Sequence, residues 1–283
     1  MICYLCESTS FTARKGIVRD APDLGILECR HCGLVTLSSL SHIEAGCYEE
    51  SGMHGASIPS VAEWLKTTDA DDQRRFDMLR SLLPNKKLLD FGCGAGGFLA
   101  KAKSLAGTIS GVEVEQRVGL HWGARLSIYP DLQAAGGPYD LITAFHVIEH
   151  LLDPRGTLKT LANMLAKNGR LVLEVPSSSD ALLSLYDLEA FQRFTYWSKH
   201  LFLFNADTVQ QLASQADLRV VAIQQYQRYP LSNHLHWLSQ GKPGGHQSWS
   251  FLDTPALTQA YAASLAAVGK CDTLIVYLET DTP

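Results

Sequence analysis

The sequence lacks an excess of basic residues, a long apolar run and a leader-like start. It has 24 Lys and Arg against 29 Asp and Glu, which gives a net charge of -5. Without an overall positive field, nucleic acid is not expected as the main partner. No apolar run is long enough to span a bilayer, and no secretory segment follows Met1. We therefore expect a cytoplasmic protein without a membrane span, and its oligomeric state stays open.

Cysteine, in contrast, is concentrated at the N-terminus, where four of the seven cysteines form two Cys-x-x-Cys pairs. This spacing is typical of a tetrahedral zinc site. The predicted metal ligands are Cys3, Cys6, Cys29 and Cys32. Four thiolates leave no open position for a substrate, so the Zn²⁺ is expected to be structural. Disulfides between the same cysteines would instead indicate an exported protein.

Three regions are expected along the chain: a zinc-binding ribbon at 1–45, a helical connector at 46–84 and an α/β domain at 85–283. So small a ribbon would depend on metal binding for its folding energy. Its short strands are expected at 17–18, 26–27 and 34–35. In the α/β domain we expect strands at 87–90, 108–113, 139–144, 170–175, 219–223 and 273–278. Helices are expected at 98–105, 158–165, 208–216 and 257–267, the second of them capped by Asn168 and Gly169. Apolar strands that alternate with helices predict a parallel sheet covered on both faces.

A glycine-rich turn follows the first strand of this domain, and residues 90–97 read DFGCGAGG. Ligands of open α/β sheets bind at such strand ends. The spacing of the glycines fits a dinucleotide fingerprint, but Asp90 with alternate glycines also fits the turn of S-adenosylmethionine methyltransferases. We favour the second interpretation, because a carboxylate beside the turn would repel a pyrophosphate and suits an ammonium and a sulfonium.

Four motifs in order resemble class I S-adenosylmethionine-dependent methyltransferases. They are 88–96 (LLDFGCGAG), 111–113 (GVE), 139–151 (YDLITAFHVIEHL) and 169–176 (GRLVLEVP). The resemblance implies an α/β fold with a Rossmann-like seven-stranded sheet. The cysteine knuckle ending in 29–35 (CRHCGLV) is similar to that of bacterial methyltransferases of sugar, polysaccharide and natural-product pathways. Sugar C-methyltransferases of this kind usually carry a longer C-terminal domain, which this chain lacks. Among O-, N- and C-methylation, this difference favours O- or N-methylation.

The resemblance also implies a set of cofactor-binding residues for S-adenosylmethionine. Glu113 would accept the ribose hydroxyls, Asp131 would contact the adenine amino group, and Arg75 or its neighbour Arg74 would pair with the methionyl carboxylate. The full set is Asp90, Gly92, Cys93, Gly94, Gly96, Glu113, Val114, Asp131, Leu132, Phe145, Tyr48 and Arg75.

Catalytic residues are expected just after the strand at 139–144. His150 is our candidate general base, and Glu149 would orient it or the substrate. His146 lies four residues before His150, on the same face of a helical turn. His146, Glu149 and His150 could alternatively bind a catalytic metal, since ubiquinone-pathway O-methyltransferases look similar here with a carboxylate in the first position. His200 is a second candidate base. Residues 228–270 are expected to form a substrate lid, with a loop over 228–246.

The predicted function is therefore methyl transfer from S-adenosylmethionine to a polar small molecule, such as a sugar or nucleotide-sugar. Two alternatives stay open. One is an RNA or protein methyltransferase that uses the ribbon as a reader, although the ribbon shows no basic stripe with interleaved aromatics. The other is a zinc scaffold without catalytic activity. An NAD-dependent oxidoreductase shares only the glycine pattern.

Overall fold

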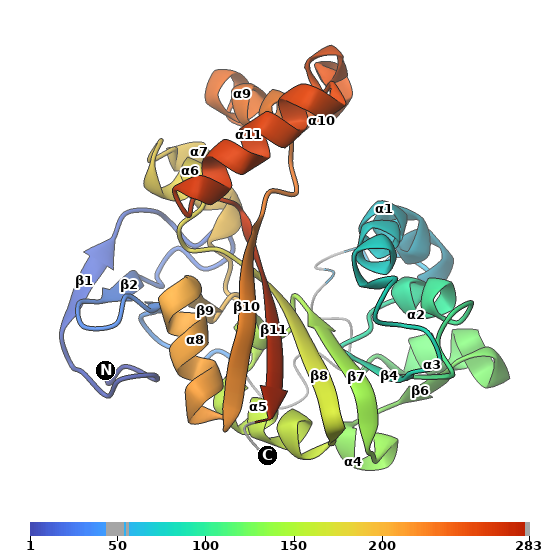
Figure 1. Ribbon diagram of the computed structural model, residues 1–283. Coiled ribbons are helices and arrows are strands. Elements are labelled where there is room, and N and C mark those ends of the chain that lie inside the picture. The colour runs from blue at the N-terminus through green and yellow to red at the C-terminus, as the bar shows by residue number, and fades with distance from the viewer. Residues whose placement is uncertain (44–53, 55–56, 281–283) are drawn as a thin grey trace.

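A computed structural model describes residues 1–43, 54 and 57–280. Its centre is a seven-stranded sheet in the order β10-β11-β8-β7-β4-β5-β6 (Figure 1). The strands are β4 (Lys87–Phe91), β5 (Thr108–Val112), β6 (Ser127–Tyr129), β7 (Tyr139–Phe145), β8 (Leu165–Pro176), β10 (Leu218–Tyr226) and β11 (Thr273–Thr280). The pairs from β6 to β8 are parallel, whereas β11 runs antiparallel to both of its neighbours. The predicted Rossmann-like α/β sheet is thereby confirmed.

Both faces of this sheet are buried, because successive side chains along a strand point to opposite faces. Leu88 packs in a cluster with residues of α1 and α2, whereas Leu89 packs in a cluster with residues of α5 and α8. The helices are α1 (Val61–Leu79), α2 (Gly97–Ala102), α3 (Gln116–Trp122), α4 (Leu132–Ala135), α5 (Pro154–Asn163), α6 (Ala181–Ser184), α7 (Glu189–Thr195), α8 (Ala206–Gln215), α9 (Leu231–Gln240), α10 (Gly245–Ser248) and α11 (Pro255–Ala267). Short 3-10 turns are η1 (Gly123–Arg125), η2 (Ile148–His150) and η3 (Ser250–Leu252). None of the helices in this part of the chain has the length and apolar character that a bilayer crossing requires.

Helix α1 begins at a capping box, which explains why the connector becomes helical at this point. Ser60 Oγ accepts a hydrogen bond from the Glu63 backbone N–H at 3.2 Å, and the Ser60 backbone N–H donates to Glu63 Oε2 at 2.8 Å. The helix then runs for 19 residues. In Figure 1 it stands close to the ends of β4 and β7, and its side chains reach the cavity described below.

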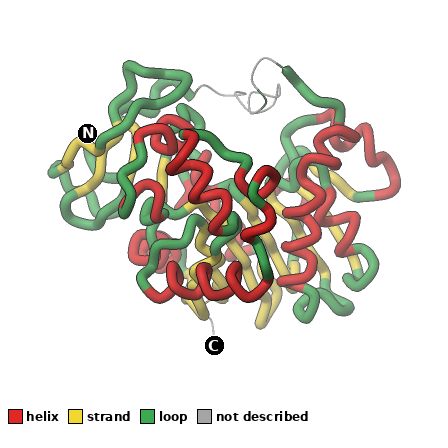
Figure 2. The backbone as a smooth tube through the Cα atoms, turned by 90° about the horizontal axis from the view of Figure 1, so that it is seen from above, coloured by secondary structure: helices red, strands yellow, loops and turns green. Residues whose placement is uncertain are grey.

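The N-terminal ribbon is built into the rest of the molecule. Its strands β1 (Phe11–Arg14), β2 (Ile26–Cys29) and β3 (Val35–Leu37) form a second sheet, which is completed by β9 (Phe202–Leu203) from far along the chain. Figure 2 shows these short strands at one end of the molecule, beside the N-terminus. Leu34 and Phe202 belong to the same core cluster as Leu173 and Val276 of the large sheet. The ribbon therefore packs as part of the main core.

Three elements differ from the sequence predictions. The first ribbon strand is β1, and residues 17–18 form no strand. Helix α5 ends at Asn163, so Asn168 and Gly169 do not cap it. They lie within β8, where Asn168 has a φ of 62° and the pairing with β7 shifts register. The turn signal at these residues belongs to an irregularity of the strand. Residues 231–240, expected to be a loop, form α9.

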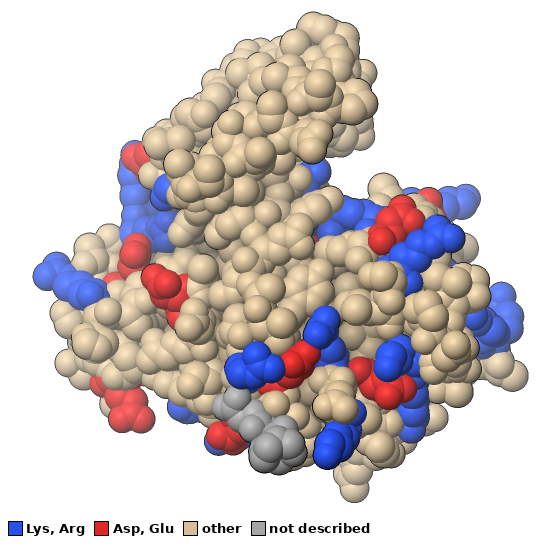
Figure 3. All heavy atoms as spheres, in the orientation of Figure 1, with Lys and Arg blue, Asp and Glu red and all other residues tan. Residues whose placement is uncertain are grey.

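The segment between β10 and β11 forms a helical lobe of α9, α10 and α11. Residues 231–268 contain two charged side chains, Lys242 and Asp253. The lobe stands above the ends of the strands in Figure 1, and its face in Figure 3 is free of charged side chains. It occupies the place predicted for the substrate lid.

Candidate active site

The glycine-rich turn follows β4 and forms one wall of a cavity. Gly92, Gly94 and Gly96 have φ values of 68°, 52° and 81°, a region that side chains disfavour. A Cβ on Gly92 would lie 2.5 Å from Val147 Cγ2, so a side chain has no room there. The backbone of the turn can therefore approach a ligand directly.

The cavity beside this turn has a volume of about 390 Å³. Most of the predicted cofactor-binding residues line it: Arg75, Asp90, Gly92, Cys93, Gly94, Glu113, Val114 and Phe145. Trp64 of α1 and Glu115 after β5 also line it and were not predicted. Gly96 belongs to the turn but not to the lining, and Tyr48 lies outside the described residues.

Asp131 and Leu132 do not reach this cavity. Asp131 caps α4, where its Oδ1 accepts a hydrogen bond from the Ala134 backbone N–H at 2.7 Å. The helix cap accounts for the aspartate after β6. The structure therefore does not place Asp131 at the cavity where the predicted contact with an adenine would form.

Asp90 is a buried carboxyl group at the strand end, 2% exposed. Its Oδ1 accepts a hydrogen bond from Thr143 Oγ1 at 2.7 Å. Burial raises the pKa of this carboxyl, and the hydrogen bond from Thr143 lowers it. The effect of burial is larger, so the pKa is raised to about 7. A cation in the cavity would stabilise the charged form.

Glu113 lies at the end of β5 and is tied to the glycine turn. Its Oε2 accepts a hydrogen bond from the Gly94 backbone N–H at 2.9 Å, and its Oε1 accepts one from the Glu115 backbone N–H at 3.1 Å. Burial raises the pKa of Glu113 despite these bonds. Its carboxyl oxygens therefore line the cavity beside the turn.

His146 lies between two carboxylates. Its Nδ1 is 3.1 Å from Glu149 Oε1, and its Nε2 is 3.0 Å from Glu174 Oε1. Burial alone would lower the pKa of His146, but the hydrogen bonds to the two acids outweigh it and the pKa is raised. His146 therefore bridges Glu149 and Glu174, and its Nε2 also lies 3.2 Å from Arg228 Nη1.

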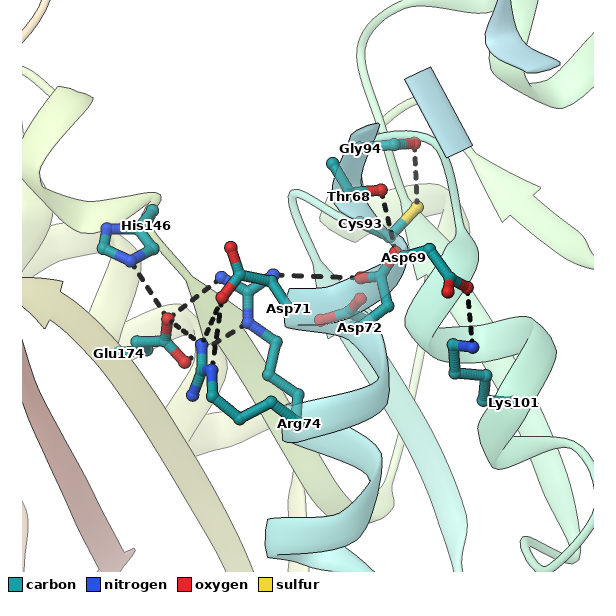
Figure 4. A network of polar contacts seen from close by, with 12 residues as sticks. Thr68, Asp69, Asp71, Asp72, Arg74, Cys93, Gly94, Lys101, His146 and Glu174 are labelled. Atoms are coloured by element: carbon teal, nitrogen blue, oxygen red, sulfur yellow. Dashed lines mark hydrogen bonds and ion pairs between the residues drawn. The ribbon is translucent and has the colours of Figure 1, made fainter. Parts of the chain in front are cut away.

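Glu174 of β8 is the centre of the polar network in Figure 4. It is 0% exposed, and its Oε1 accepts hydrogen bonds from Arg74 Nη2 at 2.7 Å and from Arg75 Nη2 at 3.0 Å. Burial would raise the pKa of Glu174, but His146 and Arg75 hold it well below its usual value. Both arginines predicted to meet a cofactor carboxylate thus already pair with this acid. A lone glutamate in an apolar strand is the signal that could have revealed it.

His150 and His200 lie side by side, with ring centroids 5.0 Å apart. His150 Nδ1 is 2.7 Å from the Lys199 carbonyl oxygen, and His200 Nδ1 is 3.0 Å from the Thr195 carbonyl oxygen. Since a carbonyl only accepts, Nδ1 carries the proton in each ring and Nε2 is the basic nitrogen. Burial lowers the pKa of His150, and it lowers that of His200 to about 4. Both imidazoles are therefore neutral at pH 7.

Among the residues that the structure describes, two groups of side chains are arranged so that they could hold a metal ion. One consists of the four predicted cysteines, whose sulfur atoms all lie within 4.8 Å of one another. The other consists of Glu149, His150 and His200, with the same limit on its ligand atoms. The second group differs by one residue from the catalytic metal site that the sequence offered as an alternative, because it contains His200 in place of His146.

A second cavity of about 340 Å³ meets the first one at His146, which lines both. His150 lines the first and His200 lines the second. The apolar wall of the second cavity is made of Phe191, Phe194, Trp197 and Trp237. Its lining also includes the Asp and Arg residues Arg19, Asp180, Arg228 and Asp272. Arg228, Tyr229, Asn233, His234 and Trp237 come from the segment predicted as a lid. The four predicted catalytic residues thus gather where the two cavities join.

Solved structures share the α/β fold of this chain. One similar chain comes from a complex of the Haloferax volcanii Trm112 methyltransferase activator. The match has a TM-score of 0.53 and 13% identity, and it covers 79% of this chain and 97% of that chain. A Thermotoga maritima protein described as a SAM-dependent methyltransferase, possible histamine N-methyltransferase, has a TM-score of 0.50 and 18% identity over 78% of this chain and 94% of its own. Similarity at these identities shows the fold.

The family follows from the sequence match. A methyltransferase-domain family model matches residues 68–223, more than half of the chain, and the chain belongs to this family. It is 31% identical over 117 residues to the ubiquinone biosynthesis O-methyltransferase of Caulobacter sp. (strain K31), covering 37% of this chain and 46% of that one. It is 35% identical over 113 residues to the protein of that name from Parvibaculum lavamentivorans, covering 36% and 42%. The chain thus spans less than half the length of these relatives.

Proposed function

We propose that this protein transfers a methyl group from S-adenosylmethionine to a hydroxyl oxygen of a polar small molecule. The observation that carries the proposal is the junction of the two cavities. His146 lines both, and Glu149, His150 and His200 surround this point. A donor in the first cavity and an acceptor in the second would meet beside neutral histidines. Orientation of two bound reactants is the main contribution that such a site makes to the rate.

The first cavity suits S-adenosylmethionine in charge and shape. Asp90 is a buried carboxyl group with a raised pKa, which an ammonium group would stabilise in its charged form. Glu113 presents oxygens that accept from ribose hydroxyls. A side chain at Gly92 or Gly94 would meet Val147 or Trp64, so the cradle is kept open by glycine. When bound, S-adenosylmethionine supplies a methyl group already activated by its sulfonium.

We assign the role of general base to His150. Its Nε2 is the unprotonated nitrogen, because Nδ1 donates to the Lys199 carbonyl oxygen. Nε2 would take the proton of the acceptor hydroxyl as the oxygen attacks the methyl carbon. Glu149 Oε1, 3.9 Å from that nitrogen, would stabilise the imidazolium that forms. His146 holds Glu149 in place, and both of its ring nitrogens already face carboxylates, so it does not compete as the base.

We further infer that the four cysteines hold one structural Zn²⁺. The Cys3 and Cys32 sulfurs are 3.6 Å apart, and the Cys6 and Cys29 sulfurs are 3.5 Å apart. Bonds of about 2.3 Å from each sulfur to one tetrahedral ion give separations of this size. The ion would offset two of the four negative charges of the thiolates and hold the four sulfurs together.

A sugar or nucleotide-sugar is our first candidate acceptor, supported by the aromatic wall and polar lining of the second cavity. A ubiquinone precursor is the second candidate, and the two relatives named above support it. A divalent ion on Glu149, His150 and His200 is an alternative way to activate the hydroxyl. It is supported by Glu149 Oε2, which is buried and has no hydrogen-bond partner in the described part of the chain.

The test combines calorimetry with a variant, His150→Gln. Wild-type protein is expected to bind S-adenosylmethionine with one zinc per chain. The variant should bind it equally well but lose about 10²–10⁴-fold in turnover of an accepted sugar or phenol. His121→Gln, outside both cavity linings, is the matched control and should retain full turnover. Full turnover by His150→Gln would exclude the base assignment, and a second metal equivalent lost in this variant would favour the divalent ion.

A further inference from the structure

The ribbon contacts the segment that carries His200. Asp20 Oδ1 accepts a hydrogen bond from the Ser198 backbone N–H at 2.9 Å, and Asp20 Oδ2 accepts one from Ser198 Oγ at 2.7 Å. The Arg19 backbone N–H donates to the Tyr196 carbonyl oxygen at 3.0 Å. These bonds place the loop around Arg19 in a defined position beside the second cavity.

Arg19 is held over the aromatic wall of that cavity. Its guanidinium carbon lies 4.7 Å from the ring centroid of Trp197 and 5.8 Å from that of Phe194. Its Nη1 donates to the Phe194 carbonyl oxygen at 3.1 Å. A guanidinium stacked on aromatic rings loses little freedom when it binds an anion, and its remaining N–H groups match two anionic oxygens.

The other charged groups of the cavity are already engaged. Arg228 Nη2 pairs with Asp71 Oδ2 at 2.5 Å. Asp272 accepts hydrogen bonds from the backbone N–H groups of Arg228 and Tyr229 at 3.1 and 3.2 Å. Asp180 accepts one from the Leu182 backbone N–H at 2.7 Å, and burial raises its pKa to about 8. These two acids therefore repel an anion less than free carboxylates would.

Arg19 differs from these groups, because no carboxylate of the described residues forms an ion pair with it. Its neighbour Asp20 directs both oxygens to Ser198. A guanidinium that has no carboxylate partner among the described residues, on the wall of a cavity that also contains His200, has the chemistry of an anion-binding group.

From these contacts we propose that the acceptor carries an anionic group, a phosphate or a carboxylate, and that Arg19 of the ribbon binds it. The inference rests on the proposed function, since it takes the second cavity as the acceptor site. It gives the ribbon a direct part in substrate recognition. An acceptor anchored at Arg19 would lie along Trp197 toward His200, whose ring centroid is 5.5 Å from that of Trp197.

The test is calorimetry on the full-length protein with four probes: glucose 1-phosphate, pyrophosphate, benzoate and uncharged glucose. The phosphates and benzoate separate the two kinds of anion, and glucose reports binding without charge. Arg19→Gln is compared with Arg30→Gln, an exposed arginine of the same ribbon whose Nε donates to Thr12 Oγ1. Arg19→Lys keeps the charge but removes the planar fork.

We expect at least one anion to bind wild-type protein, at least tenfold weaker binding to Arg19→Gln, an intermediate value for Arg19→Lys and no change for Arg30→Gln. The affinity for S-adenosylmethionine should be the same in all four proteins, which also shows that the variants are folded. Absence of anion binding to wild-type protein, or equal binding to Arg19→Gln, would overturn the proposal. Failure to bind S-adenosylmethionine would instead refute the proposed function, and the anion titrations would still be readable.

Discussion

Two buried carboxylates show how single residues set the chemistry of this site. Glu174 is surrounded by Arg74, Arg75 and His146, so its pKa is far below the usual value. Asp90 has the hydroxyl of Thr143 as its hydrogen-bond partner, and burial raises its pKa to about 7. The first acid is therefore neutralised within the fold, whereas the second gains most from a bound cation.

This difference predicts how the binding of S-adenosylmethionine depends on pH. In the free protein Asp90 is protonated below pH 7, and the bound ammonium should lower its pKa. Affinity should therefore rise by up to about tenfold per pH unit as the pH approaches 7 from below, and then level off. Calorimetry between pH 5.5 and 8.5 measures this. Asp90→Asn should bind more weakly with a flat profile, while Asp131→Asn should behave as wild type, and an unchanged slope in Asp90→Asn would contradict the assignment.

At the scale of elements, the turn after β4 matters most, because it must leave the strand sharply and remain open to the ligand. Positive φ values at alternate glycines achieve the turn. The neighbouring element, η2, places Glu149 and His150 at the same end of the sheet. Parallel strands end at one edge, so the two loops lie side by side, with Val147 before η2 close to Gly92 of the turn.

Alanine substitution is expected to have opposite effects on the free energy of unfolding at Gly92, in the turn, and at Gly119, in α3. Gly92→Ala places a Cβ 2.5 Å from Val147 Cγ2 at a φ of 68°, so it should lower the free energy of unfolding by about 1–3 kcal/mol and weaken cofactor binding. Gly119→Ala, in α3, meets nothing within 4 Å and should raise the free energy of unfolding by about 0.5–1 kcal/mol. Urea unfolding and calorimetry of both variants provide the comparison. Equal effects would show that the turn has more room than the structure indicates.

At the scale of the whole molecule, strand pairing and hydrogen bonds connect the ribbon to the rest of the fold. Val35 of β3 pairs with Leu203 of β9, and Thr36 Oγ1 donates to the Leu201 carbonyl oxygen at 3.0 Å. The Leu201 backbone N–H in turn donates to the Glu149 carbonyl oxygen at 2.9 Å. The ribbon is thus connected to the segment that lines the second cavity, which we propose as the acceptor site, while β4, β5 and α1 supply residues of the first cavity.

Removal of the proposed zinc ion should therefore affect the two cavities differently. With a chelator, or in Cys29→Ser, we expect the second cavity to lose anion binding and turnover to fall sharply. The affinity for S-adenosylmethionine should change less than threefold. Zinc content, calorimetry and limited proteolysis of residues 1–43 follow the three effects. Equal loss of both binding activities would mean that the metal supports the whole fold.

Local sequence determined much of this protein. The run at 88–97 and the strand periodicities predicted the sheet, the glycine turn and the positions of Asp90 and Glu113. The cysteine spacing predicted the sulfur cluster. These features depend on residues close together in the chain, where the apolar pattern and the conformational freedom of glycine act directly.

Only the tertiary structure decided the rest. Arg19, His150 and Glu174 are far apart in the chain, and strand pairing across the two sheets brings their segments to one place. The same holds for Asn168, where a turn signal is overridden by the pairing of β8 with β7. Pairing energy and burial come from partners that a local pattern does not specify. The sequence by itself therefore determined the class of fold and most of the residues predicted for the first cavity, whereas the second cavity, with Arg19 of the ribbon in its lining, exists only through long-range packing.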